Sequence, residues 1–360
     1  MSEHRFPYRW RLADGYPAKG IEHHGCKVFG TFICGGGSTM GYKLAGYDHL
    51  GGVEIDPAIA KTYIENHHPT YMFVEDLRKF NQRDDLPPEL YDLDILDGSP
   101  PCSTFSIAGK REAGWGKKKK FREGQAEQTL DDLVFVYCDT IAKLRPRVFI
   151  LENVAGLVKG NAKSYCRRII DKLAASGYKR TQLFLLNAAT MGVPQTRIRT
   201  FFIGLRDDLP KLPKLTINPA EPPILFGECI DRSDKSCNVS KSTFEIWKRR
   251  APGDVRLADI LIRETGKETR FNWKLMRSDR VCFALHTFDI LMTYDYPRRL
   301  TRGERYLVST FPIDYKAEYK DAVFLTGMSV APVQMAHIAS AIWEQWLKPL
   351  GRGKCAALTT

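Results

Sequence analysis

The chain has 360 residues, of which 43% are hydrophobic and 27% charged. Because a domain takes about 150 residues, this length predicts about two domains, and the composition excludes a disordered or fibrous protein. The 54 Lys and Arg residues exceed the 42 Asp and Glu residues by 12, a charge that favours a polyanionic partner such as nucleic acid but does not establish one.

Strands are expected to alternate with helices from residue 27 to about residue 206. The predicted strands are 27–33, 49–55, 71–74, 93–96, 148–151, 182–186 and 200–204, and the predicted helices are 40–45, 57–66, 130–144 and 162–175. This order predicts an α/β fold with a parallel, doubly wound, Rossmann-like sheet. Ligands of such sheets bind at the carboxyl ends of the strands.

The alternation stops after residue 206, where Pro, Lys, Arg and scattered aromatic residues become frequent. We therefore predict one domain formed by 1–206 and 319–360, and a smaller mixed domain formed by 207–318. Residues 332–347 are expected to form an amphipathic helix that returns to the first domain.

Cysteine usage and apolar runs indicate where the protein works. The nine Cys residues include no C-x-x-C pair and no Cys/His cluster at metal spacing, which argues against a disulfide framework and against a bound metal. The N-terminus has no apolar signal core, and no stretch approaches the roughly 20 apolar residues of a membrane span. We expect a cytoplasmic protein without a membrane segment.

A glycine turn follows the first predicted strand. Gly35, Gly36 and Gly37 could let an adenosine-containing cofactor approach the backbone, and Glu54 at the end of the next strand could bind ribose hydroxyls. A plain connecting turn is an equally good interpretation of the glycines. The acidic pair Glu75-Asp76 after the third strand is also typical of a helix cap.

Two polar side chains end neighbouring strands further along the chain. Cys102 follows Pro100 and Pro101, and Glu152 opens the triplet Glu-Asn-Val. A lone Cys is most often a small buried hydrophobe. A thiol and a carboxylate at adjacent strand ends could instead face one pocket, which favours a nucleophile beside an acid.

Two basic segments flank this pair. Residues 109–124 hold seven Lys or Arg residues against two Glu residues, which indicates either a solvated loop or one that closes over a nucleic-acid backbone. In Gln195-Thr196-Arg197-Ile198-Arg199 the alternation predicts Gln195, Arg197 and Arg199 on one face of a strand. Two surface arginines paired with acids are the simpler interpretation of this spacing.

Taken in order, these segments resemble the motifs of the DNA cytosine-5 methyltransferase family from about Val28 to Trp343. The stretch from Gly98 to Ser106 is similar to the nucleophile motif, Glu152-Asn153-Val154 to the ENV triplet, and Gln195 to Arg199 to the QxRxR run. The segment from Arg299 to Pro312, with Thr301 and Glu304, resembles the ninth motif, and Gly327 to Pro332 the tenth. The ordered series carries the resemblance.

The resemblance implies S-adenosylmethionine as methyl donor. Phe32 would stack on the adenine, Glu54 would bind the ribose, Asp76 would contact the adenine amino group and Pro100 would line the pocket. The other expected cofactor residues are Gly35, Gly36, Gly37, Ile55, Leu77, Ser329 and Val330.

The resemblance also implies the reaction. Cys102 would add to carbon 6 of a flipped-out cytosine, which makes carbon 5 able to attack a methyl group. Glu152 would act near ring nitrogen 3 and Arg197 near the carbonyl oxygen, while Arg199 would orient Glu152. The expected DNA-contacting residues are Ser103, Ser106, Lys110, Arg111 and Gln195.

The implied partners are duplex DNA and a companion restriction endonuclease, for a monomeric enzyme of prokaryotic or viral origin whose domain 207–318 recognises the target. The sequence departs from the family pattern at Gly30, where an acid is usual, at Cys34, where glycine is usual, and at Met328, where asparagine is usual. Two rival hypotheses are a transfer RNA cytosine-5 methyltransferase and an inactive homologue that only binds DNA.

Overall fold

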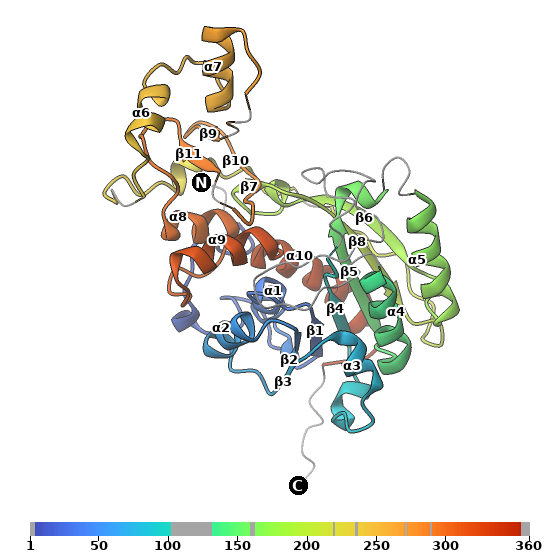
Figure 1. The fold of residues 1–360 in the computed structure, drawn as a ribbon. Helices are drawn as coiled ribbons and strands as arrows, with labels where there is room; N and C mark the ends of the chain where they lie inside the picture. Colours follow the sequence, from blue (N-terminus) through green and yellow to red (C-terminus); the bar gives the residue numbers. More distant parts are fainter. Residues whose placement is uncertain are drawn as a thin grey trace. The chain divides into compact units, whose positions relative to one another are not determined.

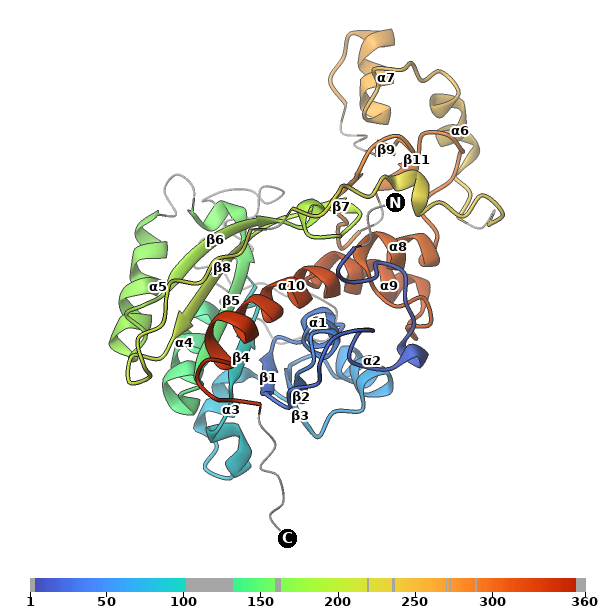
Figure 2. The ribbon, with the colours of Figure 1, turned by 180° about the vertical axis from the view of Figure 1, so that it is seen from behind.

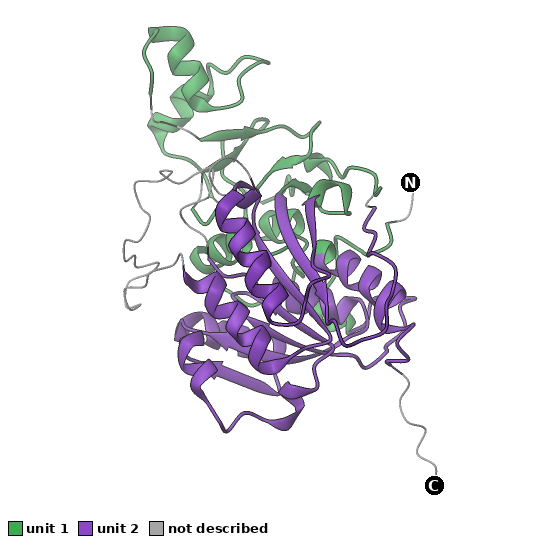
Figure 3. Ribbon diagram, turned by 90° about the vertical axis from the view of Figure 1, so that its right-hand side faces the viewer, with its two compact units in different colours: residues 1–15, 188–197, 219–334 green, residues 16–187, 198–218, 335–360 purple. Residues whose placement is uncertain are grey.

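The computed structural model describes residues 4–101, 132–158, 163–218, 220–234, 237–269, 271, 273–288 and 290–353. These residues form two compact units, coloured separately in Figure 3. One, here the sheet unit, comprises 16–187, 198–218 and 335–360; the other, here the second unit, comprises 1–15, 188–197 and 219–334. The limits of the predicted domains, at residues 206 and 319, differ from the limits of these compact units. The division into a catalytic and a target-recognition domain stays a prediction.

A seven-stranded sheet in the order β3-β2-β1-β4-β5-β8-β6 forms the centre of the sheet unit. Its strands are β1 (Lys27–Thr31), β2 (Asp48–Glu54), β3 (Tyr71–Val74), β4 (Ile95–Gly98), β5 (Val148–Val154), β6 (Gln182–Asn187) and β8 (Ile198–Leu205). The central strands β1, β4 and β5 are buried along almost their whole length, as is typical of parallel strands covered on both faces.

Helices cover both faces of this sheet, as Figure 1 and Figure 2 show. They are α1 (Gly37–Leu44), α2 (Pro57–His67), α3 (Leu77–Gln82), α4 (Leu133–Leu144) and α5 (Lys163–Ala175). On one face Phe80, Ile141 and Ile169, from α3, α4 and α5, pack in one buried cluster with Leu96 and Phe149 of the strands. The predicted doubly wound, Rossmann-like sheet is confirmed.

The prediction that every strand is parallel is wrong for β8. This strand runs antiparallel to both β5 and β6. The reversal follows from the short connection 188–197, which is too short for the crossover that two parallel neighbours need.

Small elements make up the second unit. They are β7 (Gln195–Thr196), α6 (Lys241–Trp247), α7 (Leu257–Thr265), β9 (Lys274–Met276), β10 (Cys282–Phe283), β11 (Leu291–Thr293), α8 (Arg302–Ser309) and α9 (Tyr319–Met328). Two separate apolar clusters stabilise it, one around Phe226 and Leu300 and the other around Trp247 and Leu257.

The predicted C-terminal helix is present as α10 (Pro332–Ile342), followed by one π-helical turn, Trp343–Leu347. It is buried on nearly all sides, so the predicted amphipathic pattern is wrong. The stretch Tyr319–Leu347 is long and apolar enough to span a membrane, but 78% of its most apolar window is buried inside the protein. Such burial is typical of the core helix of a soluble domain.

Candidate active site

The glycine turn lies between β1 and α1 and has an unusual backbone. Phe32 (φ 56°) and Cys34 (φ 47°) both adopt left-handed conformations, and Gly36 (φ 72°) does so as the last residue before α1. For residues with a side chain this conformation costs about 1–2 kcal/mol each. Because strained backbone collects at functional sites, the turn is a candidate ligand loop.

Glu54 is fixed beside this turn at the end of β2. Its two carboxylate oxygens accept hydrogen bonds from the backbone N–H groups of Cys34 (3.1 Å) and Asp56 (3.0 Å). Burial raises the pKa of the Glu54 carboxyl, and the N–H donors counteract part of that increase. The sheet therefore holds a carboxylate at the carboxyl edge next to the glycine turn.

The following strand end carries Asp76, which caps α3. Its carboxylate accepts a hydrogen bond from the Arg78 N–H (2.8 Å) and pairs with the Arg78 guanidinium (3.1 Å). Leu77 is buried in the apolar core, so only its main chain faces the strand edge, while Ile55 is half-buried. Helix capping and a cofactor contact are compatible roles for Asp76.

His67 supports the turn from behind. Its Nε2 lies 3.3 Å from the Gly35 carbonyl oxygen, and burial lowers the pKa of the ring to about 3. A neutral imidazole therefore donates to that carbonyl. A single His at the end of a helix gives no signal that sequence patterns can detect, and the sequence analysis missed it.

The end of β4 is anchored to the end of β5. The side chain of Asn153, which is buried, donates from Nδ2 to the Pro100 carbonyl oxygen (3.1 Å). The central residue of the Glu-Asn-Val triplet thus holds the proline segment that precedes Cys102. Cys102 itself, Ser103, Ser106, Lys110 and Arg111 lie outside the described residues.

Glu152 on β5 pairs with Arg199 on β8. Arg199 Nε lies 3.0 Å from Glu152 Oε1, and the two side chains stay 20% and 10% exposed. This pair leaves both groups at the carboxyl edge of β5 with access to solvent.

Gln195 and Arg197 are placed differently from Arg199, within the second unit. The strand is interrupted at Arg197, whose N–H bonds to the Gln195 carbonyl two residues back. The prediction that all three side chains share one strand face is therefore wrong, because the chain is not extended through Arg197.

Main-chain groups surround the buried Gln195 and Arg197 side chains. Gln195 donates to the Val308 carbonyl (3.0 Å) and accepts from the Leu285 N–H (3.1 Å). Arg197 donates to the carbonyls of Gly327 (2.9 Å), Met328 (3.2 Å) and Leu285 (3.4 Å). These contacts connect Gln195 and Arg197 to the main chain of Leu285 and of residues 327–328 in the second unit. The next two residues, Ser329 and Val330, are also largely buried.

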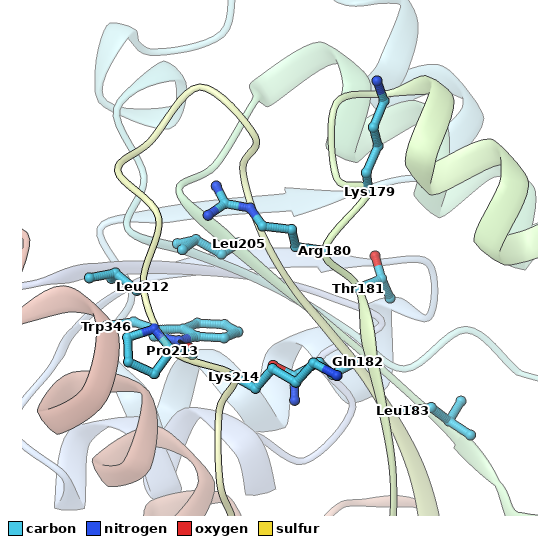
Figure 4. A pocket seen from close by; sticks show the side chains of 10 residues that line it. All are labelled: Lys179, Arg180, Thr181, Gln182, Leu183, Leu205, Leu212, Pro213, Lys214 and Trp346. Atoms are coloured by element: carbon cyan, nitrogen blue, oxygen red, sulfur yellow. Dashed lines mark hydrogen bonds between the residues drawn. The ribbon is translucent and has the colours of Figure 1, made fainter.

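A hollow of about 630 Å³ lies elsewhere in the sheet unit, beside β6 (Figure 4). Its central cation, Arg180, donates to the carbonyls of Arg206, Leu209 and Pro210, and Trp346 Nε1 donates to the Pro213 carbonyl. None of the predicted site residues lines it. Within the described part of the chain, no group of three or more His, Cys, Asp or Glu side chains is placed to hold a metal ion.

The model of the family of C-5 cytosine-specific DNA methylases matches residues 27–344. The chain belongs to this family. Its sequence is 32% identical over 197 residues to the Type II methyltransferase M.DdeI of Desulfomicrobium norvegicum, a match that covers 54% of this chain and 44% of the relative. It is 35% identical over 186 residues to the Type II methyltransferase M.Sau96I of Staphylococcus aureus, covering 51% of this chain and 40% of the relative.

A phage protein is also similar to this chain. The orphan methyltransferase M.SPRI of Bacillus phage SPR is 28% identical over 226 residues, 62% of this chain and 45% of the relative. The matched stretches thus span less than half the length of these relatives.

Solved structures share the family fold. A prophage-encoded protein from E. coli, described as a DNA modification methyltransferase, matches 89% of this chain and 99% of its own with a TM-score of 0.64 at 17% identity. A mutant of Spodoptera frugiperda DNMT2 matches 89% of this chain and all of its own with a TM-score of 0.62 at 16% identity. At these identities the likeness supports the fold alone.

Proposed function

We propose that this protein transfers a methyl group from S-adenosylmethionine to carbon 5 of a flipped-out cytosine in duplex DNA. One observation carries the proposal: the glycine turn, Glu54, Asp76, Pro100 and Glu152 lie at or near the carboxyl ends of five adjacent parallel strands, β1 to β5. Ligands of doubly wound sheets bind at this edge. Family membership, which rests on residues 27–344, makes methyl transfer to cytosine the chemistry to test there.

The residues around the glycine turn fit an adenosine-containing methyl donor. Phe32 offers a half-buried aromatic ring, and Glu54 offers a carboxylate for two ribose hydroxyls. Asp76 would accept from the adenine amino group and Pro100 would line the pocket, with Gly35 to Gly37, Ile55 and Leu77 contributing main chain. Ser329 and Val330 stay predicted cofactor residues. When bound, the donor supplies a methyl group activated by its positively charged sulfur.

Glu152 and Arg199 would act on the cytosine ring. Cys102 adds as thiolate to carbon 6, and negative charge then develops on the ring. The Glu152 carboxyl, held by Arg199, would hydrogen-bond to ring nitrogen 3, where it stabilises that charge. Carbon 5 would then bond to the methyl carbon, whose bond to the donor's sulfur would break with its electrons left on the sulfur. Transfer of the proton on carbon 5 to water and elimination of Cys102 would restore the ring.

The contacts of the two arginines favour Arg199 over Arg197 as the guanidinium next to the base. Arg199 keeps solvent access beside Glu152, whereas Arg197 is 2% exposed and donates to three main-chain carbonyls. We therefore assign Arg197 the role of holding the segment 327–328, and its expected contact with the cytosine carbonyl oxygen is the weaker proposal. Ser103, Ser106, Lys110, Arg111 and Gln195 stay predicted DNA contacts.

A trapping experiment tests the proposal. Duplex DNA in which the target cytosine carries fluorine at carbon 5 cannot lose a proton there, so a covalent complex should accumulate with the unmodified protein and S-adenosylmethionine. Cys102→Ala should form no covalent complex. With ordinary duplex DNA, the unmodified protein should transfer radiolabelled methyl groups to the DNA. Transfer to transfer RNA alone, or adduct formation by Cys102→Ala, would contradict the proposal.

The partners and setting are further proposals. The family implies DNA as substrate, and the Type II names of two relatives support a companion restriction endonuclease, although the phage relative is named an orphan enzyme. The bacterial and phage relatives support action in a prokaryotic cytoplasm. That the protein acts as a monomer stays a prediction. Bisulfite sequencing of DNA from cells that express the protein would reveal the recognised sequence.

A further inference from the structure

Asp97 is a buried acid that the proposed reaction does not use. It lies on β4, five positions before Cys102, and is 4% exposed. Burial and the like charge of Glu152 raise the pKa of its carboxyl, while the hydroxyl groups of Ser38 and Tyr42 lower it by a smaller amount than burial raises it. An acid in such surroundings costs folding stability because two hydroxyls and a neighbouring carboxylate do not balance its charge.

A second buried acid, directly before the same strand, has a different environment. Asp94 is fully buried, but it lies 2.8 Å from Arg352 Nε and 3.6 Å from Arg147 Nη1 and accepts from the Lys27 N–H. Two guanidinium groups and an N–H donor therefore compensate Asp94. Its role is structural, and it provides a matched comparison for Asp97.

The Asp97 carboxyl connects β4 to α1. The Tyr42 hydroxyl donates to Asp97 Oδ1 (3.3 Å), and the Ser38 hydroxyl also donates to this carboxyl. Ser38 and Tyr42 are four residues apart, so they lie on one face of α1. Because α1 begins at Gly37, its position sets the position of the glycine turn.

The sheet register allows no substitute for Asp97 on β1. Asp97 pairs with Gly30, so side chains at both positions would point to the same face of the sheet. A Cβ at Gly30 would lie 2.7 Å from the Ile33 side chain in the turn itself. Position 30 therefore has no room for a side chain, and the polar group at this point of the sheet comes from Asp97 on β4.

We propose that Asp97 is a positioning residue for methyl-donor binding, because it ties α1 and the glycine turn to the strand that leads to Cys102. The inference rests on the proposed function, since it concerns the same donor site. The pKa of Asp97, which burial raises to about 7, supports it, because strongly perturbed acids gather at functional sites.

Calorimetric titration with S-adenosylhomocysteine, without DNA, tests the inference by binding rather than by turnover. Asp97→Asn should raise the Kd about tenfold and Tyr42→Phe about threefold, because the turn loses its anchor. The double variant should bind about as weakly as Asp97→Asn alone, because both changes remove the same connection. In turnover assays the same variants should raise KM for the donor more than they lower kcat.

Asp94→Asn is the control. It should lower the melting temperature at least as much as Asp97→Asn while leaving the Kd within about twofold of the unmodified protein. Wild-type affinity in folded Asp97→Asn and Tyr42→Phe would overturn the inference and leave the proposed function intact. Failure of the unmodified protein to bind the probe would instead contradict the proposed donor site. If Asp97→Asn does not fold, Tyr42→Phe decides, because it removes one hydroxyl and keeps the ring.

Discussion

Arg199 and Glu152 form an ion pair across β8 and β5, with Arg199 Nε 3.0 Å from Glu152 Oε1. The two strands are antiparallel neighbours, and Val154 rather than Glu152 stands opposite Arg199 in the register. The arginine therefore reaches back along the sheet to the carboxylate. A guanidinium that holds a carboxyl group in this way fixes its orientation as well as its charge.

Replacing Arg199 should impair catalysis more than folding. Arg199→Met leaves Glu152 without its partner, and we expect the rate of methyl transfer to fall about 100-fold because a preorganised charge is lost. Single-turnover transfer of a radiolabelled methyl group measures this rate. The matched control is Arg206→Met, which breaks an ion pair with Asp208 (2.7 Å) just after the same strand. Equal losses in the two variants would contradict the role of Arg199.

Cys34 occupies a backbone conformation that suits glycine. At φ 47° its side chain strains the turn, and Cys34→Gly should raise the free energy of unfolding by about 1 kcal/mol because the strain exceeds the added flexibility of the unfolded chain. Urea denaturation measures the change. Cys34→Ala keeps a Cβ and should show no gain, so a gain of equal size in both variants would exclude strain as the cause.

The elements of the sheet unit were predictable because apolar strands and helices of ordinary length repeat there. The positions of β1, β2, β3, α2, α4 and α5 agree with the sequence analysis to within a few residues. Three features were not predictable. Helix α3 has only six residues, the periodicity of β8 carries no information on strand direction, and strands of two or three residues in the second unit are too short to show a period.

The candidate site was predictable where a side chain lies at or near the end of a strand, as Glu54 and Glu152 do. The different placement of Arg197 and Arg199 was not predictable, because a one-residue break in the strand does not change the spacing of these residues in the sequence. The sequence analysis did not single out Asp97, because the predicted strand ended at residue 96 and the contacts of Asp97 come from α1, more than fifty positions earlier. Sequence alone does not show which helix covers which strand end.

Gly36 cannot carry a side chain, for two separate reasons. Its φ is +72°, and a Cβ would lie 2.2 Å from Nε2 of the buried His67 ring. Gly36→Ala should therefore lower the free energy of unfolding by about 3 kcal/mol or more, from strain plus overpacking. Urea denaturation checks this value.

Gly177→Ala separates the two causes. Gly177 also has a positive φ (+94°), but a Cβ there would meet nothing within 4 Å. Gly177→Ala should therefore lower the free energy of unfolding by about 1–2 kcal/mol, from backbone strain alone. If the two variants lose equal stability, the contact with His67 is not what excludes a side chain at position 36.

Arg298 and Glu304 form a buried pair that stabilises the start of α8. The guanidinium donates to both carboxylate oxygens of Glu304 (2.7 Å each), which also accepts from the Thr301 N–H. Glu304→Ala should lower the free energy of unfolding by about 3–5 kcal/mol because it strands a buried charge. Chemical denaturation monitored by fluorescence measures the loss. Glu318→Ala, at an exposed helix N-cap without a side-chain bond, should change little.

Asp97 should also make stability depend on pH. Its folded pKa of about 7 lies above its ordinary value of 3.8, so the folded protein binds the proton more tightly than the unfolded chain. The stabilising contribution is complete below the unfolded pKa and is lost as pH rises through the folded pKa. Between about pH 5 and pH 8 the loss should amount to about 2–3 kcal/mol.

The groups that face this carboxyl are Ser38 and Tyr42 from α1, Tyr137 from α4 and Glu152 from β5, while the Thr31 hydroxyl of β1 donates to its main-chain carbonyl. None of these carries a positive charge that would keep the ionised form stable. Asp97→Asn cannot ionise, so its unfolding free energy should lose less between the two pH values than that of the unmodified protein. Urea denaturation at both values measures the difference, and parallel pH profiles for the two proteins would show that Asp97 keeps an ordinary pKa in the fold.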